Sequence, residues 1–297
     1  MNSKKTLLAA LLAALMLTSG CGSSASGTQA ADGVDSGVSG AITVISREDG
    51  SGTRGAFIEL TGVEEKTADG KKVDNTTADA EIANKTDVVL TSVAGNEKAI
   101  GYISLGALND TVKAVKVDGA EATVDNVKAG AYKLSRPFNI ATKGELTGVA
   151  KDFISFILSK EGQAVVTDNK YIAVNDAAES FVSDGSSGQI AVGGSSSVSP
   201  VMEKLIEAYK SVNPNASIDL QTSDSTSGMT GAMDGTFAIG MASRELKDEE
   251  AAQLTGTAIA LDGIAVIVNP ANTIDELSMD QIKSIYVGDI TDWGDLA

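Results

Sequence analysis

Three short clusters of Ser, Thr and Gly each stand between an apolar run of strand length and a stretch with apolar residues at helical spacing. The clusters are Gly50–Thr53, Ser195–Ser197 and Ser225–Gly228. This recurrence limits the possible folds more than any other feature, because strands that alternate with helices favour one architecture. It predicts an α/β fold with mixed, mainly parallel sheets flanked by helices and right-handed crossovers.

The same patterns place individual elements along the chain. Strands are expected at Ala41–Ile45, Ile190–Val192, Ala216–Leu220, Thr236–Met241 and Thr257–Asn269. Helices are expected through Ala56, Phe57 and Leu60, through Val149, Phe153, Ile154 and Ile157, from Pro200 through Val212, and from Met229 onward. The segments Gly193–Ser199 and Ser223–Gly228 are expected to be loops.

The N-terminal residues are typical of an export signal followed by a tether. Lys4 and Lys5 precede an apolar run that is short for a membrane span, and Cys21 follows small residues. This resembles a lipoprotein signal over residues 1–21, with Cys21 as the lipidated residue, although Leu17 lies one position earlier than usual. An ordinary signal peptide is the alternative. Residues 22–40 are rich in Gly, Ser and Ala and predict a flexible tether. The body is therefore expected outside the cell membrane, held there by a lipid.

Composition argues against a disulfide-stabilised domain and against a nucleic-acid-binding protein. Hydrophobic residues make up 42% of the 297-residue chain, which is enough for a sizeable core. Cys21 is the only cysteine, so the body has no internal disulfide. The formal net charge of −17, without a basic stripe, argues against nucleic acid as a partner.

Each Ser/Thr/Gly cluster can hold a small anion. The first backbone N–H groups of a helix have no partner within the helix, and the helix dipole places partial positive charge there. Glycine lets the backbone approach closely, and hydroxyl groups add donors. A simple N-cap, a serine linker or a turn remains the alternative for any one cluster.

The run from Arg47 to Arg54 is the most informative of these sites. A guanidinium can hold two oxygens of a tetrahedral oxyanion. Asp49 suits a ligand that still carries a proton, because hydrogen phosphate can donate an O–H to it and sulfate at neutral pH cannot. A charged acceptor left unpaired would then disfavour sulfate. The alternative is a surface salt bridge between Arg47 and Asp49.

Several motifs resemble the phosphate-binding proteins of bacterial ABC-type phosphate uptake systems, members of the two-lobed periplasmic-binding-protein superfamily. The matching segments are Ile45–Arg54, Ala99–Leu105, Gly193–Pro200, Gly240–Leu246 and Ala260–Asn269. The resemblance implies a two-lobed fold, with a hinge of two crossing strands near residues 135–141 and 262–269. Its ligand would be phosphate and its partner an ABC transporter permease, and the protein would be a monomer that needs no cofactor or metal.

The resemblance also implies the phosphate contacts. One set comes from Ser196, Ser197, Ser225 and Ser243, and the other from Arg47, Asp49, Ser51, Gly52 and Thr53. Two positions depart from the family pattern. Asp224 precedes Ser225 where relatives have glycine, so it can crowd the anion or shift the loop, and Ala238 stands where many relatives have an acidic residue.

The order of the motifs differs from the usual family order, in which the Gly-Ser-Ser loop comes first. Here the Arg47 motif opens the body, and the chain ends at an Asp-Trp segment that would normally precede this motif. This predicts a circular permutation joined through a linker at residues 176–188, where closing a flexible loop costs about 2 kcal/mol. One lobe would comprise residues 41–133 and 264–297, and the other residues 134–263.

Three alternatives stay open at this point. The chain can be a truncated tandem duplicate whose missing copies complete each half. The ligand can be another oxyanion, as in a sensor or scavenger. An enzyme such as a phosphatase is disfavoured, because the chain has no histidine and a serine nucleophile would lack an obvious general base.

Overall fold

The structure is a computed structural model that describes residues 38–296. The predicted signal, Cys21 and nearly all of the predicted tether lie outside the described residues. Among the residues that are described, none of the helices has the length and apolar composition that crossing a membrane requires.

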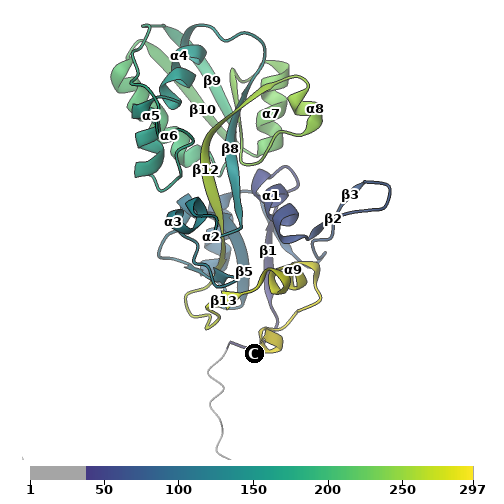
Figure 1. Ribbon diagram of the computed structural model, residues 1–297. Helices are drawn as coiled ribbons and strands as arrows, with labels where there is room; N and C mark the ends of the chain where they lie inside the picture. Colours follow the sequence, from purple (N-terminus) through teal and green to yellow (C-terminus); the bar gives the residue numbers. More distant parts are fainter. Residues whose placement is uncertain (1–37, 297) are drawn as a thin grey trace, which may run out of the picture. The chain divides into compact units, whose positions relative to one another are not determined.

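A nine-stranded sheet runs through the body (Figure 1). Its strands, in spatial order, are β10 (Ala216–Ser223), β9 (Gly188–Ser195), β11 (Ile239–Ala242), β8 (Ser135–Thr142), β12 (Thr255–Val268), β5 (Ala99–Ser104), β1 (Thr43–Arg47) and β4 (Glu81–Ala83), with β6 (Lys113–Ala114) beside β12. At one end β10, β9 and β11 pair in parallel, and at the other β4, β1 and β5 do. The predicted mixed, mainly parallel α/β fold is confirmed.

The helices lie on either side of these strands. They are α1 (Gly52–Thr61), α2 (Thr86–Ala94), α3 (Val124–Lys128), α4 (Gly148–Ile157), α5 (Lys160–Asp168), α6 (Ser199–Val212), α7 (Ser225–Asp234), α8 (Asp248–Ala251) and α9 (Met279–Val287). Short 3-10 turns occur at Leu105–Ala107 and Trp293–Leu296. Two small sheets pair β2 (Glu64–Lys66) with β3 (Lys72–Asp74) and β7 (Lys116–Val117) with β13 (Glu276–Leu277).

The predicted elements are present, with two boundary corrections that matter for function. The Ser225–Gly228 cluster was expected to be a loop, but it forms the first turn of α7. The helix begins earlier because the Asp224 carboxylate accepts a hydrogen bond from the Ser227 amide at 2.9 Å and so caps it. Strand β9 also continues to Ser195, so the first serine of its cluster belongs to the strand.

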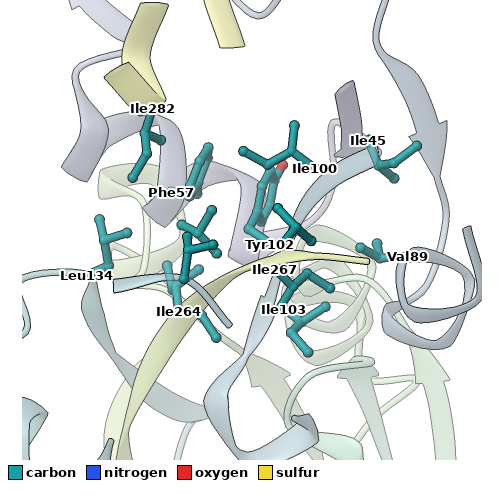
Figure 2. Packing of buried hydrophobic residues seen from close by; sticks show 14 of the residues in the cluster. Ile45, Phe57, Val89, Ile100, Tyr102, Ile103, Leu134, Ile264, Ile267 and Ile282 are labelled. Atoms are coloured by element: carbon teal, nitrogen blue, oxygen red, sulfur yellow. The ribbon is translucent and has the colours of Figure 1, made fainter. Parts of the chain in front are cut away.

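Buried apolar side chains form two large clusters. The first core draws on residues 44–134 and 264–293, together with Ile172. In it the rings of Phe57 and Tyr102 stack with their centroids 3.9 Å apart (Figure 2). The second core draws on residues 138–260. There Tyr209 packs between Phe153 and Phe156. A small third cluster lies around Met229 and Leu254.

Strands β8 and β12 connect the two cores. Strand β12 pairs with β8 as far as Gly263 and then, from Ile264, with β5. Along β8 the chain passes from Leu134 in the first core to Phe138 in the second. Figure 1 shows these two long strands side by side. The two long strands that join the cores are therefore paired with each other in an antiparallel ladder.

The beginning and the end of the described chain are neighbours. The Ile42 amide donates to the Thr291 carbonyl at 2.8 Å, and the Trp293 amide donates to the Gly40 carbonyl at 3.1 Å. Residues 176–187 form neither helix nor strand. They are fastened at Asp152, whose buried carboxylate accepts bonds from the Ser183 hydroxyl at 2.7 Å and the Asp184 amide at 3.0 Å.

Candidate anion-binding site

Seven buried hydroxyl groups meet where four helices begin. We call them the hydroxyl cluster: Thr53, Thr86, Ser195, Ser196, Ser197, Ser225 and Ser243. None has more than 8% of its surface exposed. They come from the first turns of α1, α2 and α7, from the end of β9 and the turn before α6, and from the residue after β11. Residues far apart in the sequence are thus brought into one small polar volume.

Hydrogen bonds in the cluster link residues whose strands and helices belong to different cores. Thr53 Oγ1 lies 2.8 Å from Ser197 Oγ and 3.5 Å from Ser243 Oγ. Ser195 Oγ donates to Ser243 Oγ at 3.0 Å, and the Ser243 amide donates to Ser225 Oγ at 3.1 Å. The two predicted sets of contacts are therefore joined directly.

Glycine permits this close approach. A Cβ atom added at Gly52 would lie 2.3 Å from Ser225 Oγ and 2.8 Å from Ser243 Oγ, which no side chain tolerates without displacement. One added at Gly50 would lie 2.3 Å from Asp224 Oδ1. The Thr226 amide also donates to the Gly50 carbonyl at 3.2 Å. The segment before α1 therefore packs against the start of α7 without a side chain between them.

Arg47 is the cation of the site. It is 2% exposed, and its Nη2 donates to Ser196 Oγ at 3.2 Å. Glu48 holds the guanidinium through two bonds, from Nε at 2.8 Å and from Nη2 at 2.7 Å. The Ala83 carbonyl accepts a third bond, from Nε, at 3.2 Å. A guanidinium fixed in this way is oriented before any ligand arrives.

Asp49 is not brought to the cluster. Its side chain is 97% exposed and pairs with Arg54 at 2.7 Å. The salt bridge considered between Arg47 and Asp49 does not form either, because Arg47 pairs with Glu48 and Asp49 pairs with Arg54. The structure thus gathers Arg47, Ser51, Gly52, Thr53, Ser196, Ser197, Ser225 and Ser243 and leaves Asp49 in solvent.

The four helix starts differ in how they are capped. Ser51 accepts a bond from the Arg54 amide at 3.3 Å and caps α1, so the N-cap alternative holds for this serine. Asp224 caps α7, and this is how the chain uses the residue that departs from the family pattern. The starts of α2, after Lys85, and of α6, after Val198, have no side-chain cap. The partial positive charge at these two helix starts is therefore not met by a capping side chain, although Pro200 in the first turn of α6 has no amide hydrogen to donate.

Sequence reasoning missed Thr86, and it placed Ser195 in a candidate cluster without naming it among the phosphate contacts. Thr86 opens α2, and its Oγ1 lies 3.4 Å from the Oγ atoms of both Ser196 and Ser197. The apolar spacing of Val89, Leu90 and Val93 would have predicted this helix, with a threonine in its first turn. Ala238, the other departure, uses its amide on the Ala191 carbonyl at 2.9 Å and takes no part in the cluster.

Buried charges near the site are paired. Arg244, which follows Ser243, makes two bonds to Glu250, at 2.7 and 2.8 Å. Burial raises the pKa of Glu250, but the bonds from Arg244 and from the Lys247 amide outweigh it, so the pKa lies below its ordinary value. The site thus offers many neutral donors and one oriented guanidinium, which suits a small tetrahedral oxyanion.

Comparisons with known proteins agree with this geometry. The family described as PBP superfamily domain matches residues 25–161 and 180–297. Phosphate-binding protein PstS 2 of Streptococcus agalactiae serotype V is 53% identical over 260 residues, which cover 87% of this chain and 88% of that protein. Phosphate-binding protein PstS 2 of Streptococcus pneumoniae serotype 4 is 50% identical over 293 residues, 99% of both chains.

A solved structure shows the same relationship. The crystal structure of a phosphate-binding protein of a phosphate ABC transporter from Streptococcus pneumoniae TIGR4 superimposes with a TM-score of 0.70 at 50% identity. The match covers 87% of this chain and 100% of that one. Because the family match spans most of the sequence and these relatives share about half of their residues with it, the chain belongs to the PBP superfamily and, within it, to the phosphate-binding proteins of ABC-type phosphate transporters.

Proposed function

We propose that this chain captures inorganic phosphate between two lobes and delivers it to an ABC importer. The observation that carries the proposal is the buried network of Arg47, Thr53, Ser196, Ser197 and Ser243. Its donors come from segments that belong to different cores, so a ligand bound among them contacts both. The streptococcal relatives named above carry phosphate binding in their names.

The two lobes are proposed as residues 41–133 with 264–297 and residues 134–263. Support comes from the separate cores, whose members follow these ranges except for Val38, Leu134, Ile172 and Leu261. A bound anion would favour the closed arrangement, because only there do Arg47 and Ser196 face one another.

We place the protein on the outer face of the bacterial cell membrane, attached through lipidated Cys21, as a monomer that meets a permease. The sequence of the signal supports this, and the names of the relatives support a binding role rather than catalysis. Radiolabelled palmitate incorporation in expressing cells tests the anchor, with Cys21→Ser as the control. Incorporation into this variant at the level of the parent would contradict it.

The proposed permutation fits the adjacency of the two ends. Residues 40–42 bond to residues 291–293, so a chain joined there would run from the Asp-Trp segment into the Arg47 motif. The Streptococcus pneumoniae relative aligns along 99% of both chains, so it has the same order. A monomer with one site supports the permuted single copy, whereas exchanged halves between chains would support the tandem fragment.

Calorimetric titration of ligand-stripped protein with phosphate tests the function. We expect saturable binding at one site per monomer, with a dissociation constant at or below about 1 μM, equivalent to roughly −8 kcal/mol. The proposal would be refuted if the titration released or absorbed no heat of binding and phosphate did not change the unfolding temperature of the protein.

One observation favours a second candidate, a site for several tetrahedral oxyanions. Asp49 lies in solvent, and the carboxylate of Glu48 is already engaged by Arg47. A free acceptor for a ligand proton is therefore less evident than the sequence suggested. Competition of phosphate with arsenate and sulfate decides the question. If sulfate bound as tightly as phosphate, the site would recognise the shape and charge of the anion but not its proton.

A further inference from the structure

We propose that Thr86 is a phosphate contact, supplied with the start of α2 as a further wall of the site. This inference rests on the proposed function. It concerns a residue far from the motifs that suggested the site, since Thr86 and Ser196 are 110 positions apart.

The position of the hydroxyl is the first argument. Thr86 is 5% exposed, and its Oγ1 faces the Oγ atoms of Ser196 and Ser197, two of the serines expected to hold the anion. The Thr86 hydroxyl is equally far from the Ser196 and Ser197 hydroxyl groups, so it borders the space in which these two serines would hold the anion. A tetrahedral ion held by the two serines would have the Thr86 hydroxyl beside it.

The lengths of these contacts are the second argument. Hydroxyl–hydroxyl bonds cluster at about 2.7–2.8 Å. Thr53 and Ser197 meet at 2.8 Å, whereas both contacts of Thr86 measure 3.4 Å. Thr86 is therefore buried with two long contacts and, among the described side chains, no short one. A hydroxyl in this state gains a full hydrogen bond when a ligand oxygen comes between the three residues.

The capping pattern is the third argument. Ser51 and Asp224 cap α1 and α7 with their side chains, whereas Lys85 before α2 caps nothing. The amide groups at the start of α2 thus keep their partial positive charge beside the Thr86 hydroxyl. Asp87, which follows in the first turn, is exposed and outside the cluster.

The test compares three variants by calorimetric titration with phosphate. Thr86→Val keeps the shape and removes the hydroxyl, and we expect it to weaken binding about 10- to 100-fold. Thr86→Ser keeps the donor and should stay within about threefold of the parent. Thr91→Val is the matched control, because Thr91 lies on the same helix with an exposed hydroxyl that donates to the Asp87 carbonyl at 2.9 Å. It should bind as the parent does.

The outcomes separate this inference from the function itself. Equal affinity of Thr86→Val and Thr91→Val, with the parent binding phosphate, overturns the role of Thr86 and leaves the function standing. A parent that does not bind phosphate refutes the function. A crystal structure of the parent with phosphate gives a readout that does not depend on variant folding. We expect a phosphate oxygen within about 3 Å of Thr86 Oγ1. A phosphate that lies farther away, with another residue between it and Thr86, would reject the proposal.

Discussion

Two buried polar groups in this protein are built in opposite ways. In the hydroxyl cluster and around Arg47, each side chain has at least one hydrogen-bond partner. The second group, which we call the crossover cluster, consists of Ser104, Arg136, Tyr171 and Asp262. There Ser104 Oγ, Arg136 Nε and Nη1, and Tyr171 Oη have no partner among the described residues. Every side chain of the first group has a partner, with Thr86 held by two long contacts, whereas four polar atoms of the second group have none among the described residues.

The crossover cluster lies where both connecting strands leave one core for the other. Arg136 and Asp262 are register partners in the β8–β12 ladder. Arg136 stands midway between Leu134 of the first core and Phe138 of the second, and Asp262 stands between Ala260 and Ile264 in the same way. A single contact of 3.2 Å joins the two charges. The ring of Phe138 covers the guanidinium, with its centroid 5.5 Å from Cζ.

The difference shows what each group can contribute. A satisfied network specifies one arrangement, because every alternative breaks bonds. A buried ion pair with unmet donors adds little to stability, although removing one partner is costly. The crossover cluster, at the proposed hinge, therefore adds little to stability, while the hydroxyl cluster favours the arrangement in which residues from both cores share hydrogen bonds.

The largest expected effect comes from unpairing the crossover cluster. Arg136→Met leaves the Asp262 carboxylate buried without a countercharge, so the free energy of unfolding at pH 7 should fall by about 3–5 kcal/mol. Urea denaturation measures it. The double variant Arg136→Met with Asp262→Leu should be as stable as the parent or more stable, because apolar side chains fill the same place. If the double variant were as unstable as the single one, the pair would be a stabilising element after all.

Removing the cation of the site should act on binding instead. Arg47→Met deletes the oriented guanidinium, and phosphate affinity should fall about 1000-fold, equivalent to roughly 4 kcal/mol. Calorimetry measures the affinity. Lys128→Met is the control, since Lys128 lies on α3, pairs with Asp176 at 3.6 Å with both side chains exposed, and should change affinity little. Equal losses of phosphate affinity in both variants would show that the net charge of the protein attracts the anion, and that the oriented guanidinium of Arg47 has no special role.

A smaller effect should appear in the pH dependence of stability. Burial raises the pKa of Asp262 to about 6, although the charge of Arg136 acts in the opposite direction. An acid with a higher pKa in the folded protein than in the unfolded chain binds its proton more tightly when folded. Its contribution to stability is therefore complete below about pH 4 and lost as the pH rises through 6. The loss amounts to roughly 2–3 kcal/mol.

The comparison with Asp262→Asn isolates this contribution. Other carboxylates give the parent their own pH dependence, and the variant keeps them. The difference in unfolding free energy between parent and variant should therefore change between pH 4 and pH 7, with the parent losing relative stability as the pH rises. If the difference in unfolding free energy between parent and variant did not change with pH, the pKa of Asp262 would lie near its ordinary value.

The sequence predicted the fold class and most of the site because both depend on local patterns. Strand and helix periodicities placed β1, α1, β9 and α6, and their Ser/Thr/Gly turns marked the helix starts. Thr86 escaped because a single threonine at a helix start has no local signature, and its importance comes from Ser196 and Ser197, far along the chain. The crossover cluster escaped for the same reason.

The acidic residues beside Arg47 show a subtler limit. The sequence offers both Glu48 and Asp49 next to the arginine, and composition does not say which one turns inward. The turn after β1 decides it: Glu48 stays near the guanidinium, whereas Asp49 reaches solvent and Arg54. Reasoning from residue types alone chose Asp49, and the structure does not bring that carboxylate to the cluster.

The smallest expected effect separates these two carboxylates. Because Asp49 is 97% exposed, Asp49→Asn should change phosphate affinity less than about twofold and leave the preference over sulfate unchanged. Glu48→Gln should weaken phosphate binding about tenfold, because it loosens the two bonds that fix Arg47. Competition titrations with sulfate measure both. If Asp49→Asn alone admitted sulfate, its carboxylate would have to turn inward on binding, and the site would read the ligand's proton as the sequence first suggested.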